Sequence, residues 1–171
     1  VQKDHHQYRK MFEAREQKAP IGQLQPWARW VTPEQEKYRY DTSFFLALLD
    51  ERHQLAGVKQ DNQETIGLDW MTPSQAIADF AQKKIKLAPP TWLTLLQLSQ
   101  HSFADLESRA KRMPSICDIE PIQPKFRAED GAFSILLPGD PDYDERGSTT
   151  RNRIIMRDGD LEYDNHPVSR L

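Results

Sequence analysis

The stretch WARWVTPEQEKYRYDTSFFLALL, Trp27 to Leu49, decides the fold. It holds two runs that are typical of strands, Trp27–Val31 and Tyr40–Leu49, and a loop at Thr32–Lys37 that carries a proline and charges joins them. Because the second run is apolar from Phe44 onward, we expect a strand buried on both faces, although periodicity alone would also suit a buried helix. The pattern predicts a sheet built on these two runs.

Size and composition suit about one domain. The chain has 171 residues, of which 37% are hydrophobic and 29% charged, with a net charge of −3. Such a charge does not support a nucleic-acid partner, which needs a basic face. The single cysteine, Cys117, permits neither an internal disulfide nor a zinc cluster with cysteine spacing. No apolar run reaches the length of a membrane span, and because the chain starts at Val1 we interpret it as part of a longer protein.

Helices are predicted before and after the strand pair. Four are expected, and two of them have a capping residue at the start. The ranges are Gln2–Lys18, Thr72-capped Pro73–Lys84 with Gln75 completing a capping box, Thr91–Ser99, and Ser102-capped Phe103–Met113. Glu64–Leu68 is a short strand candidate. We divide the chain into residues 1–113 and an extension at 114–171 that packs on them.

Prolines break the extension into short pieces. Strands are expected at Phe133–Leu137, Arg153–Arg157 and Leu161–Tyr163. Asp158-Gly159 between the last two predicts a two-residue hairpin turn.

Aromatic residues are the first candidates for a binding site. Trp27, Trp30, Trp70, Phe44 and Phe45 could line a ligand pocket, but large rings more often fill a core, and we favour the core for any one of them.

Charged residues are the second group of candidates for a binding or catalytic site. Arg39 could contact a phosphate, or it could pair with Asp41 on the same face of the strand. Tyr40, between them, points to the other face. Glu64 could act as an auxiliary base or outer metal contact, although a lone glutamate is more often solvated.

No catalytic motif emerges elsewhere. The adjacent His5 and His6 cannot face one metal site, and Cys117 has no histidine near it in the sequence. The last three residues, Ser169-Arg170-Leu171, are a conservative variant of the peroxisomal address Ser-Lys-Leu. They suggest a peroxisomal location and an import receptor as a partner; without them the cytoplasm or mitochondrion would be expected.

Taken together, six blocks resemble the Nudix hydrolases, and within them the peroxisomal acyl-CoA diphosphatase branch. The blocks are Trp27–Pro33, Arg39–Ala47, Glu64 with Trp70–Ala76, Leu87–Thr91, Leu136–Asp140 and Arg151–Ile154. The resemblance implies an α/β/α sandwich around a mixed sheet, here partial and with an extended tail. It also implies hydrolysis of the diphosphate of CoA or acyl-CoA with Mg²⁺ or Mn²⁺.

The family's catalytic box is missing from the chain. That box supplies metal ligands from one helix and includes a Glu-Glu pair, which occurs nowhere in this sequence. We therefore expect the metal ligands upstream of Val1 and no hydrolase activity from this chain alone. By the same resemblance Arg39 is expected to contact phosphate, and Tyr40, Phe44 and Trp30 to form the pocket wall. The alternative is a non-catalytic Nudix-like binding or interaction module.

Overall fold

The computed structural model describes residues 10, 12–14, 16, 21–49, 67–112, 115–129, 131–143 and 148–168. Its elements after the first helical residues are η1 (Ile21–Gln23), β1 (Leu24–Val31), β2 (Asp41–Ala47), α2 (Pro73–Ala81), α3 (Pro89–Ser99), α4 (Phe103–Ala110), η3 (Ile116–Asp118), β3 (Lys125–Glu129), β4 (Ala132–Leu136), β5 (Arg153–Arg157) and β6 (Asp160–Asp164). Helices and strands are both present, and the predicted α/β class is confirmed. None of the described helices has the length and apolar character needed to cross a bilayer.

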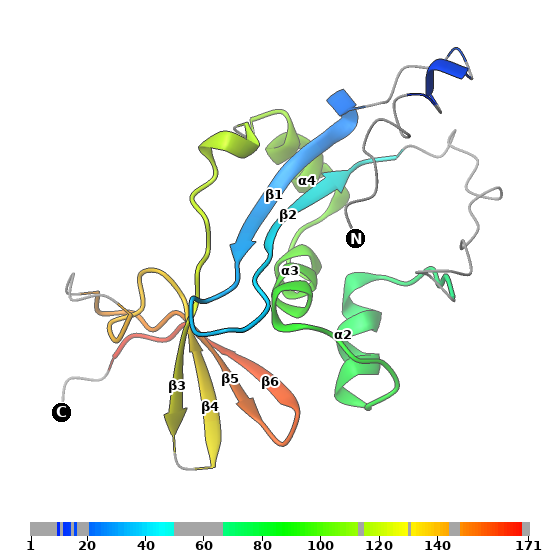
Figure 1. Ribbon diagram of the computed structural model, residues 1–171. Coiled ribbons are helices and arrows are strands. Elements are labelled where there is room, and N and C mark those ends of the chain that lie inside the picture. The colour runs from blue at the N-terminus through cyan, green and yellow to red at the C-terminus, as the bar shows by residue number, and fades with distance from the viewer. Residues whose placement is uncertain are drawn as a thin grey trace.

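The strands form two antiparallel sheets. β1 pairs with β2, and the other four strands follow in the order β3-β4-β5-β6 (Figure 1). The predicted pairing of the two opening runs is therefore confirmed. The described residues contain one parallel bridge, at Trp30 and Ile122, where Val31 N donates to Ile122 O at 2.9 Å and Ile122 N donates to Arg29 O at 2.8 Å.

A β-bulge shapes the first strand. The register shifts between Pro26 and Ala28, so that Trp27 is the extra residue opposite β2. Strict alternation would bury every second side chain, but the bulge allows Trp27, Ala28 and Trp30 all to be buried. This strand thereby supplies two tryptophans to the core.

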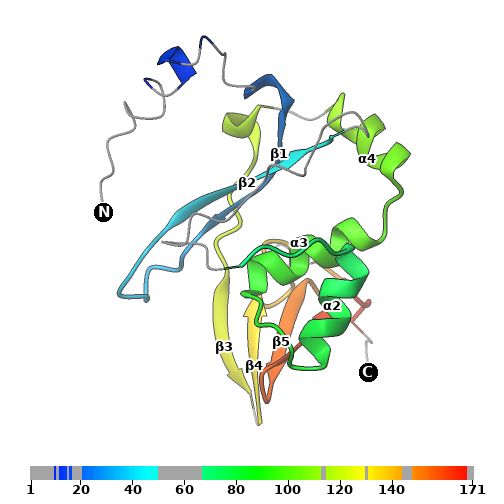
Figure 2. The same cartoon turned by 90° about the vertical axis from the view of Figure 1, so that its right-hand side faces the viewer.

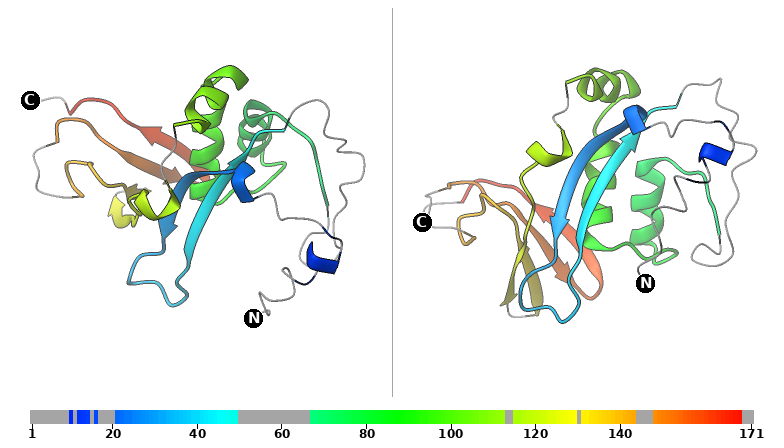
Figure 3. Two further views of the ribbon diagram at one scale, coloured as in Figure 1. Left: turned by 90° about the horizontal axis from the view of Figure 1, so that it is seen from above. Right: turned by 45° about the horizontal axis from the view of Figure 1, so that its top comes forward.

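One core joins the hairpin, the helices and the second sheet. Trp27 and Trp30 of β1 pack in one cluster with Trp92 and Leu93 of α3, and with the second sheet. The members from that sheet and its exit are Ile135, Ile154 and Leu137. α3 accordingly lies between the β1–β2 hairpin and the four-stranded sheet (Figure 2), with α2 beside it (Figure 3).

The expectation that the second run is buried on both faces is wrong. In β2 only Phe44 and Leu46 are half-buried, and the other residues of the strand are exposed, with Phe45 at 47% exposure. The cause is the sheet's size, because in the described part of the chain β2 pairs only with β1. Its apolar side chains therefore alternate between the core and the open face.

Three of the predicted helices form. α2 and α4 end earlier than predicted, whereas α3 begins two residues earlier, at Pro89. α2 ends at Ala81 rather than Lys84 because Lys83 adopts a left-handed backbone conformation, φ 60°, which terminates a helix. Thr72 accepts a hydrogen bond from Gln75 N at 3.1 Å, but the Gln75 side chain donates to Asp79 instead, so the reciprocal half of the predicted capping box is missing. The box is complete at α4, between Ser102 and Asp105.

Two other predicted elements fall largely outside the described residues. The Gln2–Lys18 helix is described only at Lys10, at Phe12–Ala14, which are helical, and at Glu16. Of the Glu64–Leu68 strand only Gly67 and Leu68 are described, and neither has regular secondary structure.

The second sheet matches the expected strands and adds one. The β5–β6 hairpin turns at Asp158 and Gly159, with φ values of 53° and 79°, as the two-residue turn requires. β3 was not predicted, because its residues, Lys-Phe-Arg-Ala-Glu, are mostly charged or small.

A buried ion pair fastens the long connection between β4 and β5. Arg153 donates Nε and Nη2 to the two carboxylate oxygens of Asp140, at 2.9 and 2.7 Å, and both side chains are buried. Burial alone would raise the pKa of the Asp140 carboxyl, but Arg153 and the backbone N–H groups of Asn152 and Asp142 outweigh it and hold that pKa below its usual range. The two sequence blocks at Leu136–Asp140 and Arg151–Ile154 are thus held together by this contact.

Candidate substrate-binding pocket

An apolar cavity of about 410 Å³ opens where the β1–β2 hairpin, the start of α3 and the second sheet meet. Its size lies within the range of small-molecule sites, roughly 300–1,000 Å³. The lining is Trp30, Val31, Thr32, Pro33, Tyr40, Thr42, Phe44, Ala88, Pro89, Pro90, Thr91, Pro124, Phe126 and Ile135. Rings, prolines and aliphatic groups dominate, and none of these residues is charged.

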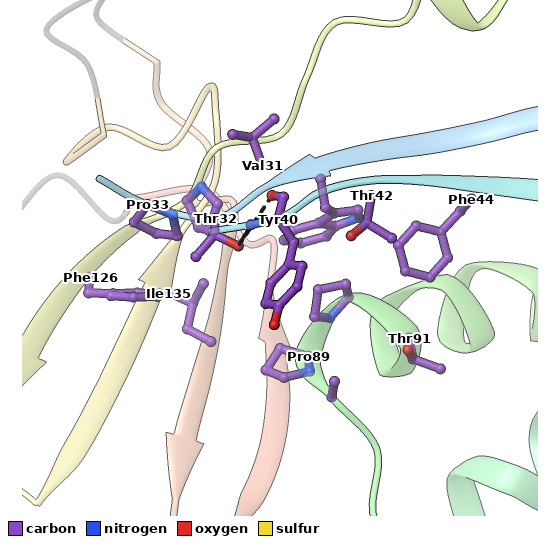
Figure 4. Close-up of a pocket in the computed structure, with 14 residues that line it drawn as sticks. Val31, Thr32, Pro33, Tyr40, Thr42, Phe44, Pro89, Thr91, Phe126 and Ile135 are labelled. Atoms are coloured by element: carbon purple, nitrogen blue, oxygen red, sulfur yellow. Dashed lines mark hydrogen bonds between the residues drawn. The ribbon is translucent and has the colours of Figure 1, made fainter. Parts of the chain in front are cut away.

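The residues that flank the loop of the β1–β2 hairpin, Thr32 and Tyr40, form what we call its neck, and their hydrogen bonds hold Tyr40 over the cavity. Thr32 N donates to Tyr40 O at 2.9 Å, and Tyr40 N donates back to Thr32 Oγ1 at 3.0 Å. Figure 4 shows the Tyr40 ring extending toward Pro89 at the start of α3. The backbone of Tyr40 is therefore fixed while its ring, largely exposed, lies across the opening.

The floor comes from the second sheet. Phe126 of β3 and Ile135 of β4 are cross-strand partners, so their side chains share one face of that sheet. Pro89 and Pro90 form the opposite wall. They begin α3, because proline is favoured at the first helical positions. The cavity is thus made by rigid elements on three sides.

Three of the residues predicted to form the wall meet here. Trp30, Tyr40 and Phe44 all line the cavity, although Trp30 is also part of the core. Trp27 is buried away from the lining, where its Nε1 donates to Gln97 Oε1 at 3.2 Å. The other two aromatic candidates are solvent-facing, Phe45 on the open face of β2 and Trp70 at 65% exposure.

Arg39 lies at the rim and not in the wall. Its Nε donates to Thr32 O at 3.4 Å, which ties it to a residue that lines the cavity. The alternative pairing with Asp41 is wrong, because Asp41 instead accepts two hydrogen bonds from Arg29, at 2.8 and 2.6 Å. Those bonds lower the pKa of Asp41 and raise the pKa of Arg29. Asp41 is therefore engaged across the strand pair, and Arg39 is hydrogen-bonded to the neck of the hairpin at Thr32.

Several lining residues were not predicted as site residues. The prolines Pro89, Pro90 and Pro124 were not among the candidates, and Phe126 lies in the unpredicted β3. A proline at a helix start beside an aromatic strand is the signal that could have pointed to a wall. Glu64 and the terminal Ser169-Arg170-Leu171 lie outside the described residues.

The described residues bring no metal site together. No group of three or more His, Cys, Asp or Glu side chains that could hold an ion occurs among them. The cavity can accept an apolar or aromatic part of a ligand, with threonine hydroxyls and the tyrosine at its edge. No carboxylate, histidine, cysteine or lysine that could act as a general base is among its lining residues.

Comparison with known proteins places this geometry in a family. Residues 1–98 match the model of the NUDT19 Nudix domain. The chain is 32% identical over 144 residues to the acyl-coenzyme A diphosphatase NUDT19 of Gallus gallus, covering 82% of this chain and 38% of that protein. It is 30% identical to the proteins of the same name in Xenopus laevis, over 159 residues and 85% of this chain, and in Homo sapiens, over 151 residues and 81%.

These matches cover part of each relative's length. The chain spans 38% to 39% of the length of these relatives. No solved structure matches it. Since the family model covers more than half of the residues, and the cavity walls at the hairpin and at the start of α3 lie inside the matched segment, this chain belongs to the NUDT19 Nudix family.

Proposed function

We propose that this chain forms the substrate-binding wall of a Nudix diphosphatase that hydrolyses the diphosphate of CoA or acyl-CoA. The observation that carries the proposal is the apolar cavity between the hairpin and α3, in a chain whose relatives are named acyl-coenzyme A diphosphatases. An acyl chain is apolar and long enough to need such a cavity, whereas the charged diphosphate is not suited to a wall without charges.

The rim supports an orientation for the substrate. With the apolar arm between Phe44 and Pro89, the diphosphate lies outside the cavity, on the side of the hairpin neck. Arg39 stands there, and a guanidinium fork matches phosphate oxygens. Tyr40 then separates the two regions, with its ring over the apolar arm.

Nudix hydrolases generally use divalent metal ions, and Mg²⁺ or Mn²⁺ is the expected cofactor of the complete enzyme. The described residues do not fit such an ion, so we assign them no catalytic step. Their part is to bind the substrate, to exclude water from its apolar arm and to hold the diphosphate at the rim. A peroxisomal location and recognition of Ser169-Arg170-Leu171 by an import receptor belong to the same proposal.

The test is direct binding by the purified chain. We expect saturable binding of decanoyl-CoA by isothermal titration calorimetry, and no hydrolysis with Mg²⁺ or Mn²⁺ by chromatography. Thr42 lines the cavity from an exposed position, so Thr42→Trp fills it without disturbing the core. That variant should weaken binding at least tenfold.

The control comes from the next residue along the strand. Ser43 is also exposed but points to the other face of the sheet, so Ser43→Trp should leave the affinity unchanged. Equal binding by Thr42→Trp and the wild type would refute the cavity as the site. If every protein that carries this chain binds the ester without hydrolysing it, the alternative of a non-catalytic binding module would be favoured. Hydrolysis by this chain alone would overturn the assignment of catalysis to other residues.

A further inference from the structure

A second cavity, of about 370 Å³, lies on the far side of Pro89. It is formed by the loop between α2 and α3 and by the β5–β6 hairpin, which lie side by side in Figure 2 and are joined by the ion pair of Lys83 and Asp160. Its apolar lining is Phe80, Ile85, Leu87, Pro89, Met156 and Leu161. Pro89 lines both cavities, so one residue separates them.

The sheet register shows that both cavities share a floor. Ile135 of the first cavity and Phe133 lie two residues apart on β4, so both side chains point to the same face. Phe133 is the cross-strand partner of Met156, which pairs in turn with Leu161, and both of these line the second cavity. The floor therefore runs across the sheet from β3 to β6 on one face.

Phe133 also connects the two cavities by contact. Its ring lies against that of Phe126, which lines the first cavity, with 5.2 Å between the ring centroids. An apolar chain that leaves the first cavity past Pro89 would thus run along the floor by Phe133 and its cross-strand partner Met156.

The rest of the second cavity's lining is mostly charged. Lys83, Lys86 and Asp158, together with Gly159, complete it, and Lys83 is exposed. A methylene group that reaches them gains little, because it stays beside hydrated charges. The apolar track therefore has a definite end.

We propose that the second cavity binds the distal part of the acyl chain. Its size thereby sets the chain length beyond which further methylene groups no longer improve binding. This inference rests on the proposed function, because it needs the CoA ester to occupy the first cavity. The occupant is a saturated acyl chain, which matches an apolar track that begins at the first cavity and ends at charges. Each methylene buried along the track improves affinity about fourfold.

The experiment measures binding of saturated acyl-CoA esters, from acetyl to hexadecanoyl, to the whole chain. The wild type should gain affinity with each added methylene and then reach a plateau. Met156→Trp fills the second cavity, so the plateau should come at a shorter chain, with binding of the long esters at least tenfold weaker and that of acetyl-CoA unchanged. Met156→Ala enlarges the cavity and should move the plateau to longer chains.

Ile155→Trp is the matched control, since residue 155 is next to Met156 but faces the other side of the sheet and lines neither cavity. It should leave the chain-length profile as in the wild type. Two results would overturn the inference: a wild-type affinity independent of chain length, or Met156 variants that keep the wild-type plateau. Either can occur while Thr42→Trp still weakens binding, so the first cavity can stand as the substrate site even if the second fails.

Discussion

Asp140→Asn tests the buried ion pair with almost no change of shape. In the native protein the Asp140 carboxylate accepts hydrogen bonds from Arg153 Nε and Nη2, from Asn152 N at 2.8 Å and from Asp142 N at 2.9 Å. The substitution keeps an oxygen for two of these donors but removes the charge that balances the buried guanidinium.

The size of the effect follows from the burial. Removing one partner of a buried ion pair costs about 3–5 kcal/mol in the free energy of unfolding. Arg153 keeps a second carboxylate, Asp142, at 2.6 Å, so the lower end, about 3 kcal/mol, is expected. For a chain of this size that corresponds to a melting temperature lower by roughly 6–12 °C.

The assay is urea unfolding followed by tryptophan fluorescence, with Asp142→Asn as the control. The Asp142 side chain is 44% exposed, so losing its charge should cost about 1 kcal/mol or less. If Asp140→Asn were no more destabilising than Asp142→Asn, the argument that Asp140 is the charge that matters would be refuted.

Four other outcomes are expected. Arg39→Gln should weaken CoA binding about threefold to tenfold and leave binding of an acyl-pantetheine without phosphates unchanged, as measured by calorimetry. Ser102→Ala should remove the capping box of α4 and cost about 1 kcal/mol, seen as faster amide hydrogen exchange confined to that helix. Gly159→Ala should lower the free energy of unfolding by about 1–2 kcal/mol, because its φ is 79°, whereas Gly22→Ala, where the φ is not positive and the space is open, should have little effect. Because the folded pKa of Asp140 lies below its ordinary value of 3.8, its stabilisation is complete well above that pH and is lost as the pH falls through the folded pKa. Urea midpoints should therefore fall more steeply in the wild type than in Asp140→Asn as the pH is lowered from about 5 to 2.

Local signals in the sequence predicted most elements correctly. The Thr72-Pro73 and Ser102 helix starts and the Asp158-Gly159 turn depend on residues within a few positions, and all three form. The ends of helices were less accurate, because a left-handed residue such as Lys83 is not marked by its residue type.

Long-range packing could not be predicted in the same way. The burial of β2 depends on how many strands pair with it, and that number cannot be predicted from a run such as Phe44–Leu49. The pocket wall at Phe44 and Tyr40 was anticipated from resemblance, but the contribution of Phe126 and Ile135 depends on the second sheet folding back against α3. The partner of Asp41 was wrong for the same reason, since Arg29 reaches it only across the strand pair.

The shared core has a practical consequence for anyone who shortens this chain. Trp27 and Trp30 share one core cluster with Ile135 and Ile154, more than a hundred residues later in the sequence. A version that stops at residue 113 would lose the second sheet's share of that cluster and expose apolar surface that the sheet now covers, so it should aggregate where the longer protein stays dispersed. Engineers who want the hairpin will have to keep the last sheet with it.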